Sequence, residues 1–327
     1  MAIRPAYFAF PGTSEARLRT HLIDELPIER LHVTGLAPAR KEDRGVLFRA
    51  HLGVSDACGS MTPRMYKCVP FYVSTRGYGV YLNMPARSTF WFGTRITSNV
   101  QMAVEDDYLD YFVILGDSMK EVLDRYTGVT GKSPVPPKWS FGLWISKMTY
   151  ESEAQVMDVA KELRARKLPA DVIHLDTGWF EKNWICDLEF SKERFPGPKR
   201  MMDTLREMGF RVSLWQMPDI RKESKMFAEG LEKGYFVRHA DGYLTPAPHR
   251  RATIDFTNPE AVAWYQDKLR RLFKLGASAI KTDFGEAAPD DGAYANGTRG
   301  HRMHNLYPLL YNKAAFGATD PCCLAGS

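Results

Sequence analysis

Beyond Pro137, apolar segments short enough to be strands alternate with segments whose apolar residues recur at helical spacing. This alternation limits the folds open to the chain, because strands that alternate with helices usually pair in parallel. A parallel sheet is therefore expected in the second half of the sequence. Its strands are expected at residues 139–146, 170–175, 210–215 and 277–282.

Capping residues mark where several of the expected helices begin. Ser152 and Gln155 have the spacing of a capping box, in which two side chains satisfy backbone amides at a helix start. Asn258 is followed by Pro259, which supplies an N-cap and then proline at the first helical position. Glycine closes two of the helices. Beside the helix that starts near Ser152, helices are expected at residues 198–208, 259–275 and 305–316.

Residues 69–115 have a different pattern, made of short aromatic and β-branched segments separated by turn residues. Such a pattern is typical of a β-sheet domain. The proline-rich stretch 131–137 is stiff, because proline fixes φ and removes a backbone donor. We therefore expect an N-terminal β-rich domain at residues 1–130 and a second domain at residues 138–327. The expected strands of the first domain are 69–73, 78–83, 89–92 and 111–115, followed by a helix at 117–128.

Polar and aromatic side chains stand at the ends of three of the expected parallel strands. Asp176 and Asp283 follow two strands, and Trp215 ends the strand between them. In a (β/α)8 barrel the catalytic groups lie at the carboxyl ends of the strands. We therefore expect a barrel. An open doubly wound sheet is the alternative, but no GxGxxG follows a strand, which counts against a dinucleotide site.

Asp283 is the strongest candidate for chemistry. Lys281 lies two residues before it, so both side chains point to the same side of a strand. A neighbouring cation favours the ionised carboxylate, which is the form that attacks an anomeric carbon. A structural Lys–Asp pair that orients a loop explains the same spacing, and the spacing alone leaves both interpretations open.

The other candidates also have two interpretations each. Asp176 can accept hydrogen bonds from sugar hydroxyls, or it can cap the turn that begins at Thr177. Trp215 and Trp179 can stack on a sugar or belong to the core, and the same holds for Trp184. His174, two residues before Asp176, is a candidate to orient that carboxylate.

Several short segments are informative when they are taken together. They are Asp56–Ala57, Tyr66–Lys67, residues 69–75, 77–80 and 126–128, Pro136–Pro137, Cys186–Asp187, Phe195–Pro196, residues 255–259 and Lys281 to Glu286. With these segments the sequence resembles glycoside hydrolase family 31 over roughly residues 56–316. The resemblance implies an N-terminal β-sandwich-like domain followed by the first half of a (β/α)8 barrel.

The resemblance also implies roles for individual residues. Asp283 is expected to be the catalytic nucleophile, and Glu286 falls at an active-site glutamate of the family. The expected substrate-binding residues are Asp176, Trp215, Lys281 and Trp179.

The implied activity is that of a retaining, exo-acting α-glycosidase that releases α-linked xylose or glucose from non-reducing ends. The similarity is to the α-xylosidase-like branch. However, Thr177–Gly178 and Lys147–Met148 of this chain differ from the residues that the α-xylosidase-like branch has at these positions. The expected substrate is therefore either an α-xyloside or an α-glucoside. The implied partner is an α-linked oligosaccharide or α-glycoside, without a metal or organic cofactor.

Retaining hydrolysis uses two carboxyl groups about 5 Å apart. In the family the general acid/base follows the nucleophile by several strands' worth of sequence, whereas this chain ends at Ser327 after about four β/α units. We therefore expect a fragment without the C-terminal half, inactive as given, and a full-length protein that can form homo-oligomers. The alternatives are an α-glucan lyase or transglycosylase on the same fold, and a sugar-binding remnant.

Composition argues against other classes of function. The net charge of +5 is spread among acidic residues, so nucleic-acid binding is not expected. No apolar stretch approaches the roughly 20 residues of a membrane span. The five cysteines form no CxxC pair, and the histidines form no HExxH motif. Together with the absence of a leader-like segment, sparse cysteines favour a cytoplasmic protein.

Overall fold

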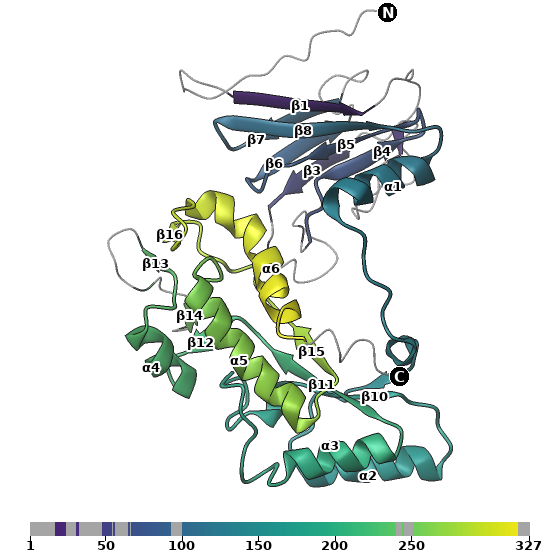
Figure 1. Cartoon of the computed structure of the whole chain (residues 1–327), viewed down its shortest axis with the longest axis vertical. Helices are drawn as coiled ribbons and strands as arrows, with labels where there is room; N and C mark the ends of the chain where they lie inside the picture. Colours follow the sequence, from purple (N-terminus) through teal and green to yellow (C-terminus); the bar gives the residue numbers. More distant parts are fainter. Residues whose placement is uncertain are drawn as a thin grey trace, which may run out of the picture. The chain divides into compact units, whose positions relative to one another are not determined.

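The computed structural model describes residues 17–23, 31–32, 48–53, 55, 65, 67–92, 100–239, 244 and 251–319. The chain divides into two compact units, Met1–Pro134 and Val135–Ser327, at a point inside the proline-rich stretch 131–137 (Figure 1). Three residues on which the family resemblance draws, Asp56, Ala57 and Tyr66, lie outside the described residues.

The described residues of the first unit form two β-sheets and one helix. The elements are β1 (Arg17–Ile23), β2 (Leu31–His32), β3 (Phe48–Leu52), β4 (Phe71–Ser74), β5 (Tyr78–Leu82), β6 (Ser88–Phe92), β7 (Val100–Val104), β8 (Tyr108–Leu115) and α1 (Met119–Thr130). One sheet has the order β1-β8-β5-β4-β2 and the other β3-β6-β7. Their pairings are antiparallel, except that β1 lies parallel to β8.

Strand alternation explains how the five-stranded sheet is covered on both faces. On β4, Tyr72 points into a core shared with the three-stranded sheet, where its ring meets Phe92 edge-on at 5.2 Å. Phe71 points to the opposite face and stacks on Tyr126 of α1, with ring centroids 3.9 Å apart. The unit is therefore a β-sandwich-like domain with a helix on its outer face, as the sequence predicted.

The second unit is built on a parallel sheet of four strands in the order β15-β11-β10-β9. These strands are β9 (Trp144–Ile145), β10 (Val172–Leu175), β11 (Arg211–Gln216) and β15 (Ala279–Thr282). Strands that neighbour one another in chain order, each followed by a helix, form the start of a (β/α)8 barrel. The predicted fold class is confirmed.

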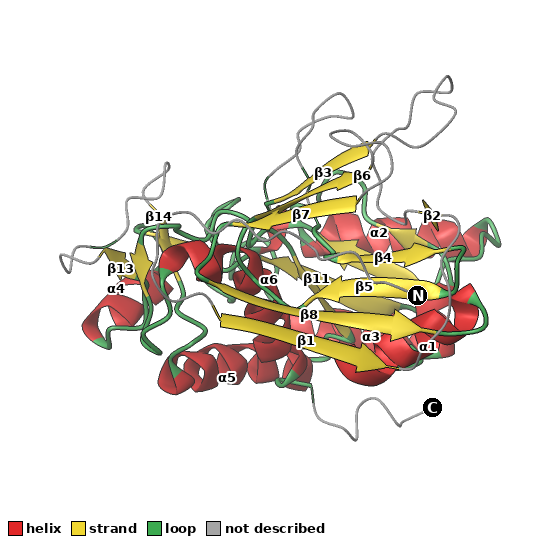
Figure 2. Ribbon diagram, turned by 90° about the horizontal axis from the view of Figure 1, so that it is seen from above, coloured by secondary structure: helices red, strands yellow, loops and turns green. Residues whose placement is uncertain are grey.

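The helices that follow the four strands are α2 (Glu153–Ala165), α3 (Pro198–Glu207), α5 (Pro259–Leu275) and α6 (Gly300–Phe316). Successive helices contact one another, α2 with α3, α3 with α5 and α5 with α6 (Figure 1). Figure 2 shows the same four helices in red, seen from above. This is the succession expected of the outer ring of a barrel.

The helix starts agree with the capping residues. Ser152 Oγ accepts a hydrogen bond from the Gln155 amide at 3.3 Å. The Gln155 side chain accepts from the Glu151 amide, one residue earlier than in an ordinary capping box. At α5, Asn258 Oδ1 accepts from the Glu260 amide at 2.9 Å, and Gly276 ends the helix with φ of 121°.

The prediction of a strand at residues 139–146 is wrong for most of that range. Lys138–Phe141 forms a 3₁₀ helix after Pro137, and only Trp144–Ile145 pairs, with β10. An apolar run indicates burial only when other elements cover it. Here Phe141 is 73% exposed and Trp144 is 40% exposed, so the described residues do not cover this run.

Small elements between β11 and α6 gave no clear signal in the sequence. They are β12 (Asp219–Arg221), α4 (Lys225–Glu232), β13 (Arg238–His239), β14 (Arg251–Thr253) and β16 (Gly292–Ala293). β12 pairs with β14, and β13 pairs with β16, both antiparallel. These two small sheets and α4 are additions to the β/α pattern, and β12 begins directly after the carboxyl end of β11.

Candidate active site

Three neighbouring strands bring the candidate residues to one edge of the parallel sheet. Asp176 follows β10, Trp215 lies near the end of β11, and Lys281 lies on β15. Trp215 and Lys281 are directly paired across β11 and β15, and Asp283 comes two residues after Lys281. The sequence therefore placed these four residues correctly at the carboxyl ends of adjacent strands.

Asp283 is held by donors from two strands and by the backbone amide of the residue that follows it. Its Oδ2 accepts a hydrogen bond from Trp215 Nε1 at 2.7 Å and lies 3.3 Å from Lys281 Nζ. Its Oδ1 accepts from the Phe284 amide at 3.1 Å. The side chain is 29% exposed. Asp283 thus presents an oriented carboxylate that a ligand can still reach.

The backbone turns sharply directly after Asp283. Phe284 has φ of 61° and Gly285 has φ of 104°, both in the left-handed region. That conformation is uncommon for an aromatic residue, whereas glycine adopts it without a Cβ clash. Tyr311 of α6 supports the turn, because its hydroxyl donates to the Asp283 carbonyl at 3.2 Å.

Tyr311 itself was not singled out in the sequence. It is fully buried and accepts a hydrogen bond from Gln216 Nε2 at 2.6 Å, so it links α6 to the end of β11. The signal was present as the spacing of Met303, Tyr307 and Tyr311, which puts a buried stripe on one face of α6. That stripe predicts burial, but it does not predict contact with Asp283.

Asp176 is also held at both oxygens. Oδ1 accepts from the Thr177 amide at 2.9 Å, and Oδ2 lies 3.2 Å from His174 Nε2. Burial alone would raise the pKa of Asp176. The two hydrogen bonds and the positive charge of Lys281 outweigh burial, so the pKa of Asp176 is lowered.

Lys281 lies between the two carboxylates. Its Nζ is 3.3 Å from Asp283 Oδ2 and 3.9 Å from Asp176 Oδ2. A cation in this position attracts both carboxylates and is one of the causes that lower the pKa of Asp176. The side chain is 47% exposed, so its remaining donors are open to a ligand.

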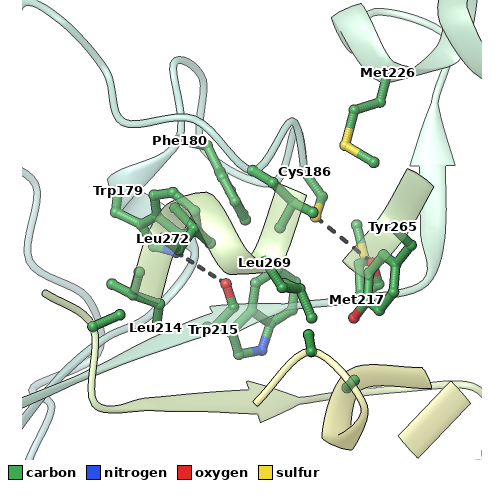
Figure 3. Close-up of a cluster of buried hydrophobic side chains, with 14 of the residues drawn as sticks. Trp179, Phe180, Cys186, Leu214, Trp215, Met217, Met226, Tyr265, Leu269 and Leu272 are labelled. Atoms are coloured by element: carbon green, nitrogen blue, oxygen red, sulfur yellow. Dashed lines mark hydrogen bonds between the residues drawn. The ribbon is translucent and has the colours of Figure 1, made fainter. Parts of the chain in front are cut away.

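The two tryptophans predicted to bind substrate are buried in this structure. Trp179 has no exposed surface, packs against Phe180 and Phe190, and donates from Nε1 to the Trp215 carbonyl at 2.9 Å (Figure 3). Trp215 is 1% exposed and reaches Asp283 only through its indole N–H. Here Trp179 fixes the end of β11, and Trp215 orients the carboxylate. A sugar contact for either ring stays a prediction.

Trp184 is the aromatic side chain that lies open beside this site. It is 41% exposed, and its ring meets Trp215 edge-on at 5.5 Å and lies 6.3 Å from Phe284. The sequence left it as either core or sugar platform. Its exposure favours the second interpretation, because an exposed ring face can stack on the apolar face of a sugar.

Gly178 sets the shape of the site beside Asp176. It lies in the 3₁₀ turn Thr177–Trp179, and its amide donates to Thr149 Oγ1 at 2.9 Å. A Cβ at this position would come within 2.5 Å of that oxygen and 2.8 Å of the Tyr150 carbonyl. Glycine therefore fits the close approach of Thr149 and Tyr150, and a larger residue at position 178 would require movement of the loop that contains them.

Glu286 follows the turn after Gly285 and is 9% exposed. A catalytic role for it stays a prediction. Within the described ranges, no group of three or more histidine, cysteine, aspartate or glutamate residues is arranged to hold a metal ion. A search of the same ranges found no helix with the length and apolarity needed to cross a bilayer.

Comparison with known proteins gives a consistent family. Residues 133–321 match the model of the glycosyl hydrolases family 31 TIM-barrel domain. The chain is 39% identical to "Alpha-xylosidase XylQ" of Lactiplantibacillus pentosus, over 79% of this chain and 35% of that protein. It is 38% identical to "Alpha-xylosidase" of Emericella nidulans, over 79% of this chain and 34% of that protein. The chain thus spans about a third of the length of the curated relatives it matches.

A relative with lower sequence identity has a different name. "Isomaltosyltransferase" of Sporosarcina globispora is 28% identical over 77% of this chain and 26% of its own length. Among solved structures, the GH31 dextranase of Flavobacterium johnsoniae complexed with glucose has a TM-score of 0.75 at 26% identity, and the match covers 84% of this chain and 35% of that one. A GH31 α-xylosidase from a soil metagenome complexed with xylose has a TM-score of 0.71 at 26% identity, over 83% of this chain and 39% of that one.

Proposed function

Because the chain belongs to glycoside hydrolase family 31, we propose that it carries the nucleophile of a retaining, exo-acting α-glycosidase and that Asp283 is this nucleophile. One observation supports the assignment above all. Asp283 Oδ2 receives both the Trp215 indole N–H at 2.7 Å and the Lys281 ammonium at 3.3 Å, at the carboxyl end of a barrel strand. These donors orient a negative charge at the place where a barrel enzyme binds substrate.

The chemical step follows from this geometry. An oxygen of Asp283 forms a bond to the anomeric carbon while the bond from that carbon to the leaving oxygen breaks, and a general acid protonates the leaving oxygen. A β-linked glycosyl ester results. Water, deprotonated by the same acid/base, then attacks the anomeric carbon and frees Asp283, so the released sugar keeps the α configuration.

The proposed substrate is an α-linked xylose or glucose at a non-reducing end. The names of the relatives support it, since two of them are α-xylosidases at 39% and 38% identity. Asp176, 24% exposed with a lowered pKa, is suited to accept hydrogen bonds from sugar hydroxyls. Lys281 is exposed on the same side and can donate to them.

Neither of the two carboxylates at the centre of the site is suited to act as the general acid. The pKa of Asp176 is lowered, and Asp283 has the role of the proposed nucleophile, whereas a general acid needs a carboxyl that keeps its proton near neutral pH. The proposal is therefore that Asp283 supplies the nucleophile and Asp176 belongs to the sugar subsite, and that neither of the two donates the proton.

A transglycosylase on the same fold shares the covalent intermediate and differs in the acceptor that attacks it. The similarity to an isomaltosyltransferase supports this second candidate. The two are separated by the product: transfer yields a longer saccharide, and hydrolysis yields a free sugar.

The experiment that tests the proposal uses an α-xylosyl or α-glucosyl fluoride with a second fluorine on the sugar ring. Fluoride leaves without protonation, and the second fluorine slows breakdown of the ester, so an acid/base is not needed for labelling. We expect the mass of the intact chain to rise by one glycosyl group. Asp283→Asn should abolish the rise, while Asp267→Asn, a change of an exposed aspartate on α5, should leave it intact. Labelling of Asp283→Asn at the wild-type rate would overturn the assignment.

A further inference from the structure

A buried polar pair lies one layer beneath the proposed sugar site. His174 on β10 and Ser213 on β11 are directly paired in the parallel register, so their side chains project on the same side of the sheet. His174 is 7% exposed and Ser213 is 1% exposed. The ring Nδ1 and the serine Oγ are 3.0 Å apart. Each lies two positions before a site residue: His174 before Asp176, which follows β10, and Ser213 before Trp215 on β11.

The second ring nitrogen of His174 faces the site. Nε2 lies 3.2 Å from Asp176 Oδ2. An ionised carboxylate can only accept hydrogen bonds, so Nε2 must carry a proton. In the neutral ring Nδ1 is then bare, and the Ser213 hydroxyl donates to it. Ser213 is thus the residue that satisfies the buried side of the ring.

Serine, histidine and aspartate in contact also occur in nucleophilic hydrolase sites. Here the serine is the innermost member and has almost no exposed surface, so no substrate reaches its oxygen. The outermost member is Asp176, at 24% exposure. The direction of the chain of hydrogen bonds is therefore from the core outward, which suits the orientation of Asp176.

We propose that His174 and Ser213 are positioning residues: Ser213 holds the His174 ring with its proton on Nε2, and that N–H fixes Oδ2 of Asp176 beside Lys281. The Thr177 amide fixes the other oxygen, so the carboxylate cannot turn. Since Lys281 also contacts Asp283, a rotation of Asp176 would disturb the nucleophile as well. The functional part of this inference rests on the proposed α-glycosidase site.

The proton position is tested without any substrate. Two-bond ¹H–¹⁵N NMR of the wild-type chain reports which ring nitrogen of each histidine is protonated, and the signal lost in His174→Gln identifies His174. We expect a single species with the proton on Nε2. Asp176→Ala should replace it with a mixture of tautomers, and Ser224→Ala, a change of a buried serine that caps α4, should not. A wild-type ring protonated on Nδ1, or on both nitrogens at neutral pH, would overturn the proposal.

The effect on the site is tested with a pair of amide substitutions. Glutamine places its amide nitrogen near the position of Nε2, and asparagine places its own near Nδ1, so only His174→Gln can still reach Asp176. We expect His174→Asn to slow labelling by the fluorinated glycosyl fluoride at least about tenfold, as for loss of a hydrogen bond to a charged group. His174→Gln should restore most of the rate.

Equal loss in both variants, with both still folded by circular dichroism, would show a packing role and overturn the positioning role. If the wild-type chain is not labelled at all, the proposed function fails. The proton position of His174 then still decides the positioning role, because that measurement needs no sugar.

Discussion

Asp283 is oriented by side chains from three elements that are far apart in the sequence. Trp215 comes from β11 and Lys281 from β15, and Tyr311 of α6 holds the carbonyl behind them. The spacing of Lys281 and Asp283 predicted their contact, because residues two apart on a strand share a side. The contact from Trp215 was not predictable in the same way, since it depends on the pairing of β11 with β15.

Removal of the indole N–H tests this orientation. Trp215→Phe keeps an aromatic ring in the core but removes the donor 2.7 Å from Asp283 Oδ2. We expect labelling by the fluorinated glycosyl fluoride to slow by about ten- to a hundredfold, which corresponds to roughly 1.5–3 kcal/mol for a hydrogen bond to a charged group. Trp144→Phe, which changes a 40% exposed indole on β9, is the matched control and should keep the wild-type rate. Equal rates for Trp215→Phe and wild type would show that the indole does not act on Asp283.

The buried carboxyl of Asp187 leads to a prediction about how the free energy of unfolding depends on pH. Burial raises its pKa to about 6, only partly opposed by the Glu189 amide that donates to Oδ1. Because this value lies above the ordinary one, the fold favours the neutral form. The stability that the group contributes is complete below about pH 4 and is lost as the pH rises through about 6.

Asp187→Asn is neutral at every pH and still accepts the hydrogen bond from the Glu189 amide. Above about pH 6 it should therefore be more stable than wild type, by about 1–2 kcal/mol after allowance for solvent screening. At about pH 4 the two should be equally stable. Urea unfolding at both pH values measures this, and a difference that is the same at both would contradict the effect of burial.

At the scale of elements, three of the four predicted parallel strands are present over most of their length. Strands expected at 170–175, 210–215 and 277–282 appear as β10, β11 and β15 with ends shifted by one or two residues. The run 139–146 is also apolar, but it begins with a 3₁₀ helix after Pro137, and only Trp144–Ile145 pairs. An apolar run indicates a tendency to be buried, and the run alone does not determine whether it pairs as a strand.

The cap of α5 was predicted from the Asn258–Pro259 sequence and is present. Asn258→Ala removes the acceptor of the Glu260 amide and should destabilise the second unit by about 1 kcal/mol. Asn258→Asp and Asn258→Ser keep an acceptor and should lose much less. Denaturant unfolding compares the three, and the cap has no such role if alanine costs no more than serine.

At the scale of the whole molecule, the described part of the second unit contains one parallel sheet with β9 and β15 as its outer strands. The site is built from β10, β11 and β15. It contains donors that orient both Asp176 and Asp283. Both of these carboxylates contact Lys281, and the pKa of Asp176 is lowered. The roles proposed for these two residues do not include proton donation to a leaving group.

From this we expect the 327-residue chain to hydrolyse nitrophenyl α-xyloside and nitrophenyl α-glucoside at essentially no measurable rate. Release of nitrophenol is followed by absorbance, with Asp283→Asn as the background. Turnover well above that background would show that another carboxyl of this chain acts as the acid. Glu286→Gln and Asp219→Asn would then identify it, since both side chains lie buried near the ends of their strands.

The most direct test is the identity of the residue that carries the sugar. After reaction with the fluorinated glycosyl fluoride, the chain is digested, and the labelled peptide is sequenced by tandem mass spectrometry. We predict the ester on Asp283, within the peptide that contains Lys281 to Glu286. A label on Asp176, on Glu286 or on any other residue would contradict the assignment of Asp283 as the nucleophile.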